Sequence, residues 1–211
     1  MSLFYGIGLD LGQRGDPAAI VVANDLEARP LAVRIQYQSA EKAGVAVRYA
    51  ERIPLGTPYP VIVERVRRLT EHPELRGKCS IAMDATGLGG PVVDMMRAAR
   101  IGCEVCAVTI TSGNHETQVP GGYHVPKQDL LASVQVLLER GELHIAKHMR
   151  EADSLMRELL SVKQRQSDSG RLKIGADGAG QHDDLVIALA LACWRSRRRR
   201  NGPGGGRLPG M

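Results

Sequence analysis

The sequence predicts an α/β fold built around a mixed β-sheet, and three observations support this prediction. Short apolar runs separated by turn-forming Asp, Glu and Pro residues follow one another near the N-terminus, which is typical of an antiparallel meander. Helical periodicities then alternate with further apolar runs of strand length along the rest of the chain. With 211 residues, 43% of them hydrophobic, the chain is long enough to bury the core of one such domain.

Each expected element follows from a local pattern. The valines of residues 59–72 are spaced roughly as an amphipathic helix requires. Pro91 stands in the first turn of the next helix, where its missing N–H costs nothing, and Gly141 closes a third helix. The expected strands are residues 3–12, 18–24, 30–40, 78–84, 103–110, 142–146 and 170–177. The expected helices are residues 59–72, 91–101, 125–140, 151–164 and a last helix that begins at the pair Asp183–Asp184, and residues 111–125 are expected to form a loop.

The positive charge of the chain is concentrated at its C-terminus. Six of the 28 Lys and Arg residues lie in the segment from Arg195 onward, which contains no acid, so the rest of the chain is nearly neutral. Gly and Pro deny this segment a packed structure, and we expect residues 195–211 to be a disordered Arg/Gly-rich tail behind a domain of residues 1–194. Such a tail either holds a phosphate backbone without reading sequence or simply keeps the protein soluble.

Neither a membrane segment nor a secretory leader is expected. No apolar run approaches the roughly 20 residues that span a bilayer, and the N-terminal apolar run has no cationic leader and soon reaches Asp10. A cytoplasmic protein without a membrane partner is therefore predicted.

The four cysteines fit a reducing compartment. Cys103 and Cys106 form a C-x-x-C pattern, but they belong to an expected strand, in which residues three apart point to opposite faces. Cys79 and Cys193 stand alone, so no second ligand pair completes a zinc site. The cysteines are expected to be small buried hydrophobic residues.

Four aspartates occupy positions that suggest a metal site. Asp10 and Asp84 each end an expected strand, and Asp183 and Asp184 begin the last helix. If the two strands are parallel neighbours, both carboxylates emerge at the sheet edge where open α/β sheets bind ligands. Clustered carboxylates without a cation repel each other and raise their own pKa values. Oxygen-only ligands favour Mg²⁺ or Mn²⁺, and two such ions about 4 Å apart activate water in phosphodiester cleavage.

Three segments in this order and spacing resemble a known family. The segments "GLDLGQRGDPAAIVV", "IAMDATGLGGPVVDMMRAARI" and "HDDLVIALALA" are similar to the nuclease domain of phage terminase large subunits, within the RNase H-like (retroviral integrase-like) superfamily. The resemblance implies an RNase H-like mixed five-stranded sheet, with an antiparallel meander of three strands plus parallel strands, flanked by helices. It also implies a two-metal-ion-dependent endonuclease of a bacteriophage or prophage that cuts DNA in genome packaging, working in the bacterial host cell.

The resemblance implies that Asp10, Asp84 and one of the two adjacent aspartates bind the metals. Alignment on the alanine that follows the helix start favours Asp184, which leaves Asp183 to cap the helix or to hold a ligand in place. A further acid that many RNase H-like nucleases carry is replaced by Ile187. His182 is a candidate to orient a carboxylate or the attacking water, although a solvent-facing loop residue is a simpler interpretation. Lys127 begins a helix and is a candidate phosphate clamp.

The chain departs from a full terminase large subunit because it lacks a G-x-x-x-x-G-K-[ST] motif. A packaging ATPase or portal protein is therefore expected on another chain, unless the sequence is an excised domain. Two alternatives to a DNA endonuclease remain open: a Holliday junction resolvase or RNase H-type nuclease, and a non-catalytic module that binds DNA or docks onto a motor.

Overall fold

The computed structural model describes residues 3–12, 16–26, 43–87, 89–166, 172–176 and 183–200. Its centre is an eight-stranded mixed sheet in the order β6-β7-β5-β4-β1-β2-β3-β8. Strands β1, β2 and β3 form an antiparallel meander, β4 and β5 continue it in parallel from β1, and β7 and β8 add parallel strands beyond β5 and β3. The predicted α/β class with a mixed sheet is confirmed, and β6, β7 and β8 extend the predicted five strands at both edges.

The strands of this sheet are β1 (Tyr5–Asp10), β2 (Ala18–Leu26), β3 (Gly44–Ile53), β4 (Cys79–Asp84), β5 (Glu104–Thr111), β6 (Thr117–Val119), β7 (Gly122–Pro126) and β8 (Leu143–Ile145). A separate hairpin consists of β9 (Val162–Gln166) and β10 (Leu172–Ala176). The helices are α2 (Tyr59–Thr70), α3 (Gly89–Ala98), α4 (Lys127–Glu139), α5 (Ala152–Ser161) and α6 (Asp184–Arg200).

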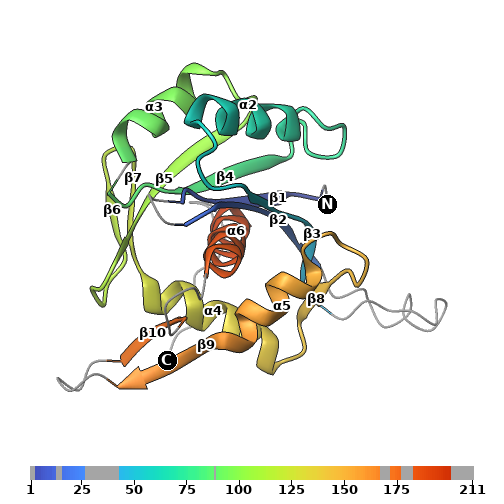
Figure 1. Ribbon diagram of the computed structural model, residues 1–211, viewed down its shortest axis with the longest axis vertical. Coiled ribbons are helices and arrows are strands. Elements are labelled where there is room, and N and C mark those ends of the chain that lie inside the picture. Colours follow the sequence, from blue (N-terminus) through green and yellow to red (C-terminus); the bar gives the residue numbers. More distant parts are fainter. Residues whose placement is uncertain are drawn as a thin grey trace.

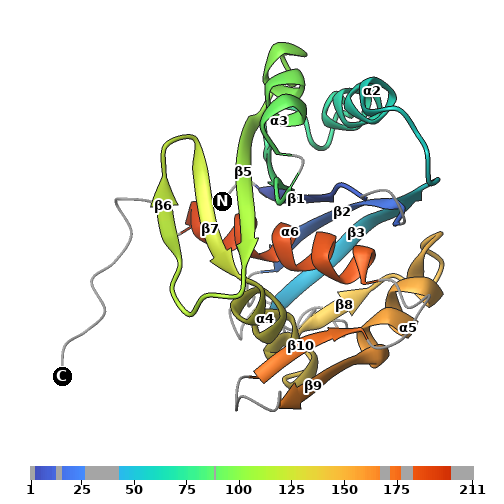
Figure 2. The same ribbon diagram turned by 60° about the vertical axis from the view of Figure 1, so that its left-hand side comes forward.

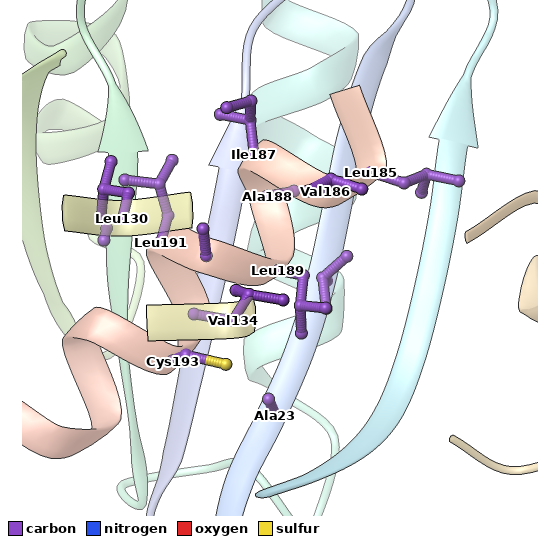
Figure 3. Packing of buried hydrophobic residues seen from close by; sticks show 14 of the residues in the cluster. Ala23, Leu130, Val134, Leu185, Val186, Ile187, Ala188, Leu189, Leu191 and Cys193 are labelled. Atoms are coloured by element: carbon purple, nitrogen blue, oxygen red, sulfur yellow. The ribbon is translucent and has the colours of Figure 1, made fainter. Parts of the chain in front are cut away.

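Helices cover both faces of the sheet (Figure 1). Helices α2 and α3 lie on one face, where they pack over Ile7, Leu9, Ile81 and Met83. Helix α6 crosses the other face, with α4 and α5 behind it, as the turned view in Figure 2 also shows. Helix α6 is apolar from Leu185 to Cys193, and Figure 3 shows several of these residues, because this part of the helix is enclosed between the sheet and α4.

Two glycines of β1 let α6 lie directly on the sheet. A Cβ atom at Gly8 would stand 1.7 Å from the carbonyl oxygen of Ala188, and one at Gly6 would stand 2.1 Å from that of Ala192. The sequence "GIGLD" therefore alternates glycines toward α6 with apolar side chains toward α2 and α3. Moving from Gly6 to Gly8 along β1 corresponds to moving one turn back along α6, so the two elements run in opposite directions.

Three expectations about individual elements are wrong. The third strand of the meander is Gly44–Ile53, whereas the expected residues 30–40 lie outside the described part of the chain. The expected loop over residues 111–125 contains the β6–β7 hairpin, which adds to the edge of the sheet through β5. The helix expected over residues 151–164 ends at Ser161, where β9 begins and pairs with β10.

Helix α6 continues to Arg200, beyond the domain boundary predicted at residue 195. Arg195 is only 5% exposed, because its guanidinium donates to the hydroxyl of Ser80 at 2.8 Å and pairs with Glu104. Arg198 pairs with Glu116 and lies over the Tyr123 ring. These acids and rings give the first arginines of the predicted tail packed partners. Residues 201–211 lie outside the described residues, and for them the disordered tail stays a prediction.

The cysteines behave as expected from the sequence. Cys79, Cys106 and Cys193 are buried, Cys103 is half-buried, and none forms a disulfide. Cys103 and Cys106 contribute to the apolar clusters on opposite faces of the sheet. Burial raises the pKa of the Cys106 thiol, which keeps it protonated and inert at neutral pH. Within the described residues, no helix combines the length and the hydrophobicity needed to cross a bilayer.

Candidate functional site

Asp10 and Asp84 end two neighbouring parallel strands. The register between β1 and β4 pairs Leu9 with Met83, so the two aspartates come directly after a matched pair. Both side chains lie on the α6 face of the sheet, because alternate residues of a strand share a face. Gly8 on β1 and Ala82 on β4 occupy this same face beneath α6. The expectation that the two carboxylates emerge together at one sheet edge is confirmed by this register.

Helix α6 brings Asp184 to the same edge. Ala192 packs on Gly6 and Ala188 packs on Gly8, and the same spacing continued by one turn places Asp184 over Asp10. Residues four apart share one face of a helix, so Asp184 belongs to the α6 face that lies on β1. Asp184 is accordingly 5% exposed. Asp183 precedes the helix and is rotated away from this face, which favours Asp184 as the partner of Asp10.

The charges at this edge interact strongly. Burial raises the pKa of Asp10 well above its ordinary value, and the nearby carboxylates of Asp84, Asp184 and Asp183 raise it further. The ammonium of Lys127 opposes this effect. Burial also raises the pKa of Asp84. Burial and the neighbouring carboxylates therefore disfavour the ionisation of Asp10, and a bound cation would relieve this penalty.

Lys127 is a cation that the protein itself places in the cluster. It is the first residue of α4, directly after β7 ends at Pro126. Its Nζ atom lies 2.7 Å from Oδ2 of Asp183, in an ion pair whose side chains are 38% and 26% exposed. The same ammonium lowers the pKa of Asp84. Lys127 therefore lies close enough to the acids to act on them or on a phosphate bound between them.

A turn stabilises the position of Asp84. The backbone N–H of Thr86 donates to Oδ1 of Asp84 at 2.8 Å, and the Thr86 hydroxyl donates to the same oxygen at 2.5 Å. The hydroxyl also accepts the N–H of Ile110 on β5 at 2.9 Å. Thr86 was not singled out from the sequence, although an aspartate two residues before a threonine is a local signal for such a turn.

Glu158 is the second contributor that the sequence did not reveal. It lies on α5 and is 7% exposed. Its Oε2 atom accepts the backbone N–H groups of Leu185 and Val186, at 3.0 and 3.2 Å. These donors belong to the first turn of helix α6, so Glu158 takes the place of a side-chain cap. Of the two roles expected for Asp183, capping the helix or holding a ligand in place, the structure does not support the first. The carboxylate of Asp183 contacts Lys127 instead.

The donor set suits a hard divalent cation. Carboxylate oxygens are the ligands that Mg²⁺ and Mn²⁺ prefer, and Asp10 lies within range of the charges of Asp84, Asp183 and Asp184. Among the described residues, however, no group of three or more His, Cys, Asp or Glu side chains is arranged so that it could hold a metal ion. Thr86 and Lys127 engage Asp84 and Asp183 instead. His182 lies outside the described residues.

Comparison with known proteins gives a consistent result for the fold. No protein-family model and no curated protein matches the sequence. The large terminase nuclease from thermophilic phage G20c is 22% identical over 92% of this chain and 82% of its own, with a TM-score of 0.61. The large terminase nuclease domain of Thermus phage P74-26 is 20% identical over 98% of this chain and 84% of its own, again with a TM-score of 0.61.

A third similar structure is the large terminase nuclease domain of bacteriophage SPP1, determined with bound manganese. It is 13% identical over 91% of this chain and 86% of its own, with a TM-score of 0.55. The G20c nuclease has also been determined with bound magnesium and with bound cobalt. The chain described here has the RNase H-like fold of the nuclease domains of phage large terminases.

Proposed function

We propose that this protein is an endonuclease that depends on two Mg²⁺ or Mn²⁺ ions and hydrolyses DNA phosphodiester bonds, as in terminase cleavage during phage genome packaging. The observation that carries the proposal is the convergence of Asp10, Asp84 and Asp184, with Asp183 beside them, at one edge of the sheet. A carboxylate such as Asp10, whose pKa is raised by burial and by neighbouring acids, destabilises the fold when it is ionised unless a cation compensates it. The similar nucleases determined with magnesium, cobalt and manganese support a divalent cation.

In this proposal, the role of each residue follows from its position in the site. Asp10, which lies close to the carboxylates of Asp84 and Asp184, would hold the metal ions together with these two residues. Bound Mg²⁺ or Mn²⁺ supplies the activation of water and the stabilisation of the leaving 3′ oxygen. The turn through Thr86 holds Asp84 in one orientation before substrate arrives.

Lys127 and Asp183 are proposed to position the substrate. In the ion pair, the ammonium of Lys127 is already held beside the carboxylates. A DNA phosphate entering the site offers this ammonium a second anion, and Lys127 would hold the phosphate while remaining tethered at the start of α4. A role for His182 in orienting a carboxylate or the attacking water stays a prediction from the sequence.

A packaging ATPase or portal protein on another chain is the proposed partner. The large terminase of bacteriophage HK97 is 13% identical over 91% of this chain, which spans only 39% of that protein. The similarity is therefore confined to one part of a longer polypeptide. In our proposal, an additional protein supplies the motor that moves DNA to this nuclease site.

The test is nicking of supercoiled plasmid in the presence of Mg²⁺ or Mn²⁺. We expect the wild-type protein to nick only with divalent metal, and Asp84→Asn and Asp184→Asn to abolish nicking, because each removes one ionised ligand. Asp94→Asn is the matched control, since Asp94 is an exposed aspartate of α3 whose side chain is 78% accessible. It should nick at the wild-type rate.

Three other results would change the assignment. Loss of nicking in Asp183→Asn but not in Asp184→Asn would make Asp183 the ligand. Preferential cutting of a four-way junction or an RNA–DNA hybrid would support the resolvase or RNase H-type alternative. No cutting by the wild type, with no thermal stabilisation by Mn²⁺, would contradict the nuclease and favour a non-catalytic module that binds DNA or docks onto a motor.

A further inference from the structure

Helix α6 obtains its N-terminal cap from a different helix. A helix start leaves backbone N–H groups without intrahelical acceptors, and the side chain of the N-cap residue usually accepts those of the second and third helical residues. Asp183 occupies the N-cap position, because its carbonyl accepts the first intrahelical hydrogen bond, which the N–H of Ile187 donates at 2.8 Å. The second and third helical N–H groups, of Leu185 and Val186, donate to Glu158 instead.

We propose that Glu158 is a positioning residue of the acidic site: by capping α6 from α5, it releases both adjacent aspartates from helix capping. Asp183 then extends to Lys127, and Asp184 stays on the α6 face above Asp10. This inference rests on the proposed metal-dependent nuclease function. It also accounts for the two aspartates before the apolar run, because neither side chain is needed to accept the N–H groups of Leu185 and Val186.

The surroundings of Glu158 hold its carboxylate in this orientation. Arg52 of β3 pairs with Oε1, while Oε2 faces the helix, so each oxygen has its own partners. A negative charge at a helix N-terminus is stabilised by the helix dipole, and Arg52 balances this charge in the apolar core. The contacts connect β3, α5 and α6, and they hold the first turn of α6 relative to the sheet that carries Asp10.

Removal of Glu158 therefore has a specific consequence at the site. In Glu158→Ala, the N–H groups of Leu185 and Val186 lose their acceptor, and Asp183 is the side chain best placed to replace it. Asp183 would then turn back to cap α6 and leave Lys127. We expect Mn²⁺ affinity and the nicking rate to fall about 10-fold or more, the effect typical of losing a residue that orients metal ligands. Glu158→Gln keeps an acceptor oxygen and should restore most of both.

A matched control separates this role from general destabilisation. Glu51 is also a buried glutamate that pairs with an arginine, Arg65, and it accepts the Tyr49 hydroxyl at 2.7 Å. Arg65 belongs to α2, on the opposite face of the sheet from α6. Glu51→Ala should lower the melting temperature but leave the dissociation constant for Mn²⁺ unchanged. Calorimetric titration with Mn²⁺ below the unfolding transition of every variant compares the three substitutions with the wild type.

A double-mutant cycle tests the capping itself without any metal. The urea midpoint should fall further on Asp183→Ala in the Glu158→Ala background than in the wild type, because Asp183 has by then become the cap. Additive shifts would overturn the inference, as would unchanged Mn²⁺ affinity in Glu158→Ala when the wild type binds Mn²⁺ and nicks DNA. If the wild type itself neither binds Mn²⁺ nor nicks, the proposed function fails, whereas a coupled cycle would still establish the cap.

Discussion

Substitution of Gly8 by alanine probes the close contact between α6 and β1, on which the whole site depends. The added Cβ would stand 1.7 Å from the carbonyl oxygen of Ala188 and 2.7 Å from the backbone nitrogen of Ala192. These are backbone atoms of one helix, so no side-chain rotation relieves the clash. The strand and the helix must separate.

The size of the effect follows from these distances. Ordinary van der Waals contact begins at 3.4 Å, so α6 has to move away from β1 by about 1.7 Å. Overpacking of this kind costs about 1–3 kcal/mol, and more when backbone must shift. Asp184 lies one turn before Ala188 and moves with the helix. Because a misplacement of about 1 Å at a reacting group can lower the rate about 10²-fold, we expect nicking to fall by at least that factor.

The assays are urea unfolding and Mn²⁺-dependent plasmid nicking, with Gly102→Ala as the control. A Cβ at Gly102, which precedes β5, would meet nothing within 4 Å. The control should therefore change stability little and leave nicking normal. A Gly8→Ala protein as stable and as active as the wild type would refute the packing of α6 against β1 described here.

Three further predictions concern charge and helix docking. The raised pKa of Asp10 means that folding favours its protonated form, so the stability of the metal-free protein falls as pH rises through that pKa. Melting curves in chelator should show a smaller loss of melting temperature with rising pH in Asp10→Asn than in the wild type, and equal pH profiles would contradict this. Lys127→Met should slow nicking but enlarge the stabilisation by Mn²⁺, because the ammonium of Lys127 competes with the metal, whereas its half-exposed pair with Asp183 contributes only about 1 kcal/mol or less to folding stability. A smaller Mn²⁺-induced melting shift in this variant than in the wild type would be evidence against competition. Trp194→Phe removes the indole N–H that donates to Glu116 at 2.9 Å and should lower the free energy of unfolding in urea by about 1 kcal/mol. Nicking should not slow, because Trp194 lies toward the end of α6 opposite to Asp184; slower nicking would show that the contact of α6 with the segment before β6 affects the site.

The sequence predicts that Asp10 and Asp84 lie side by side, because the determinants of this placement are local. Asp10 and Asp84 each follow an apolar run of strand length, and parallel neighbours bring their carboxyl ends to one edge. Alignment of Ala188 with the family pattern favours Asp184, and the packing of Ala188 and Ala192 on β1 agrees with that choice. The ends of strands and the starts of helices are marked by residues that are neighbours in the chain, so they can be predicted from short stretches of sequence.

Residues that act through contacts with distant parts of the chain could not be predicted from the local sequence. Glu158 occupies an ordinary position in an amphipathic helix, and only the packing of α5 against α6 makes it a cap. The end of α6 was placed too early because Arg195 and Arg198 look like part of a solvated charge run. Their acidic partners, Glu104 and Glu116, come from a distant strand and hairpin.

The same limit applies to the elements that were misplaced. The β6–β7 hairpin is short and polar, so its sequence resembles a loop, yet pairing with β5 and the bond from Arg97 to the carbonyl of Gly121 hold it in place. The third strand of the meander is expected at residues 30–40, whereas the run from Gly44 to Ile53 is the one that pairs with β2. Long-range pairing, rather than local propensity, decides such cases.

The most direct test of the account is anomalous diffraction from crystals of the wild-type protein soaked in Mn²⁺. The account predicts two manganese peaks at the edge of the sheet, with Asp10 shared between them, Asp84 and Asp184 on either side, and Lys127 within reach of a phosphate. A single peak would remove the second ion from the proposed mechanism. Saturated crystals with no peak among these three aspartates would contradict the central claim that they form a metal site.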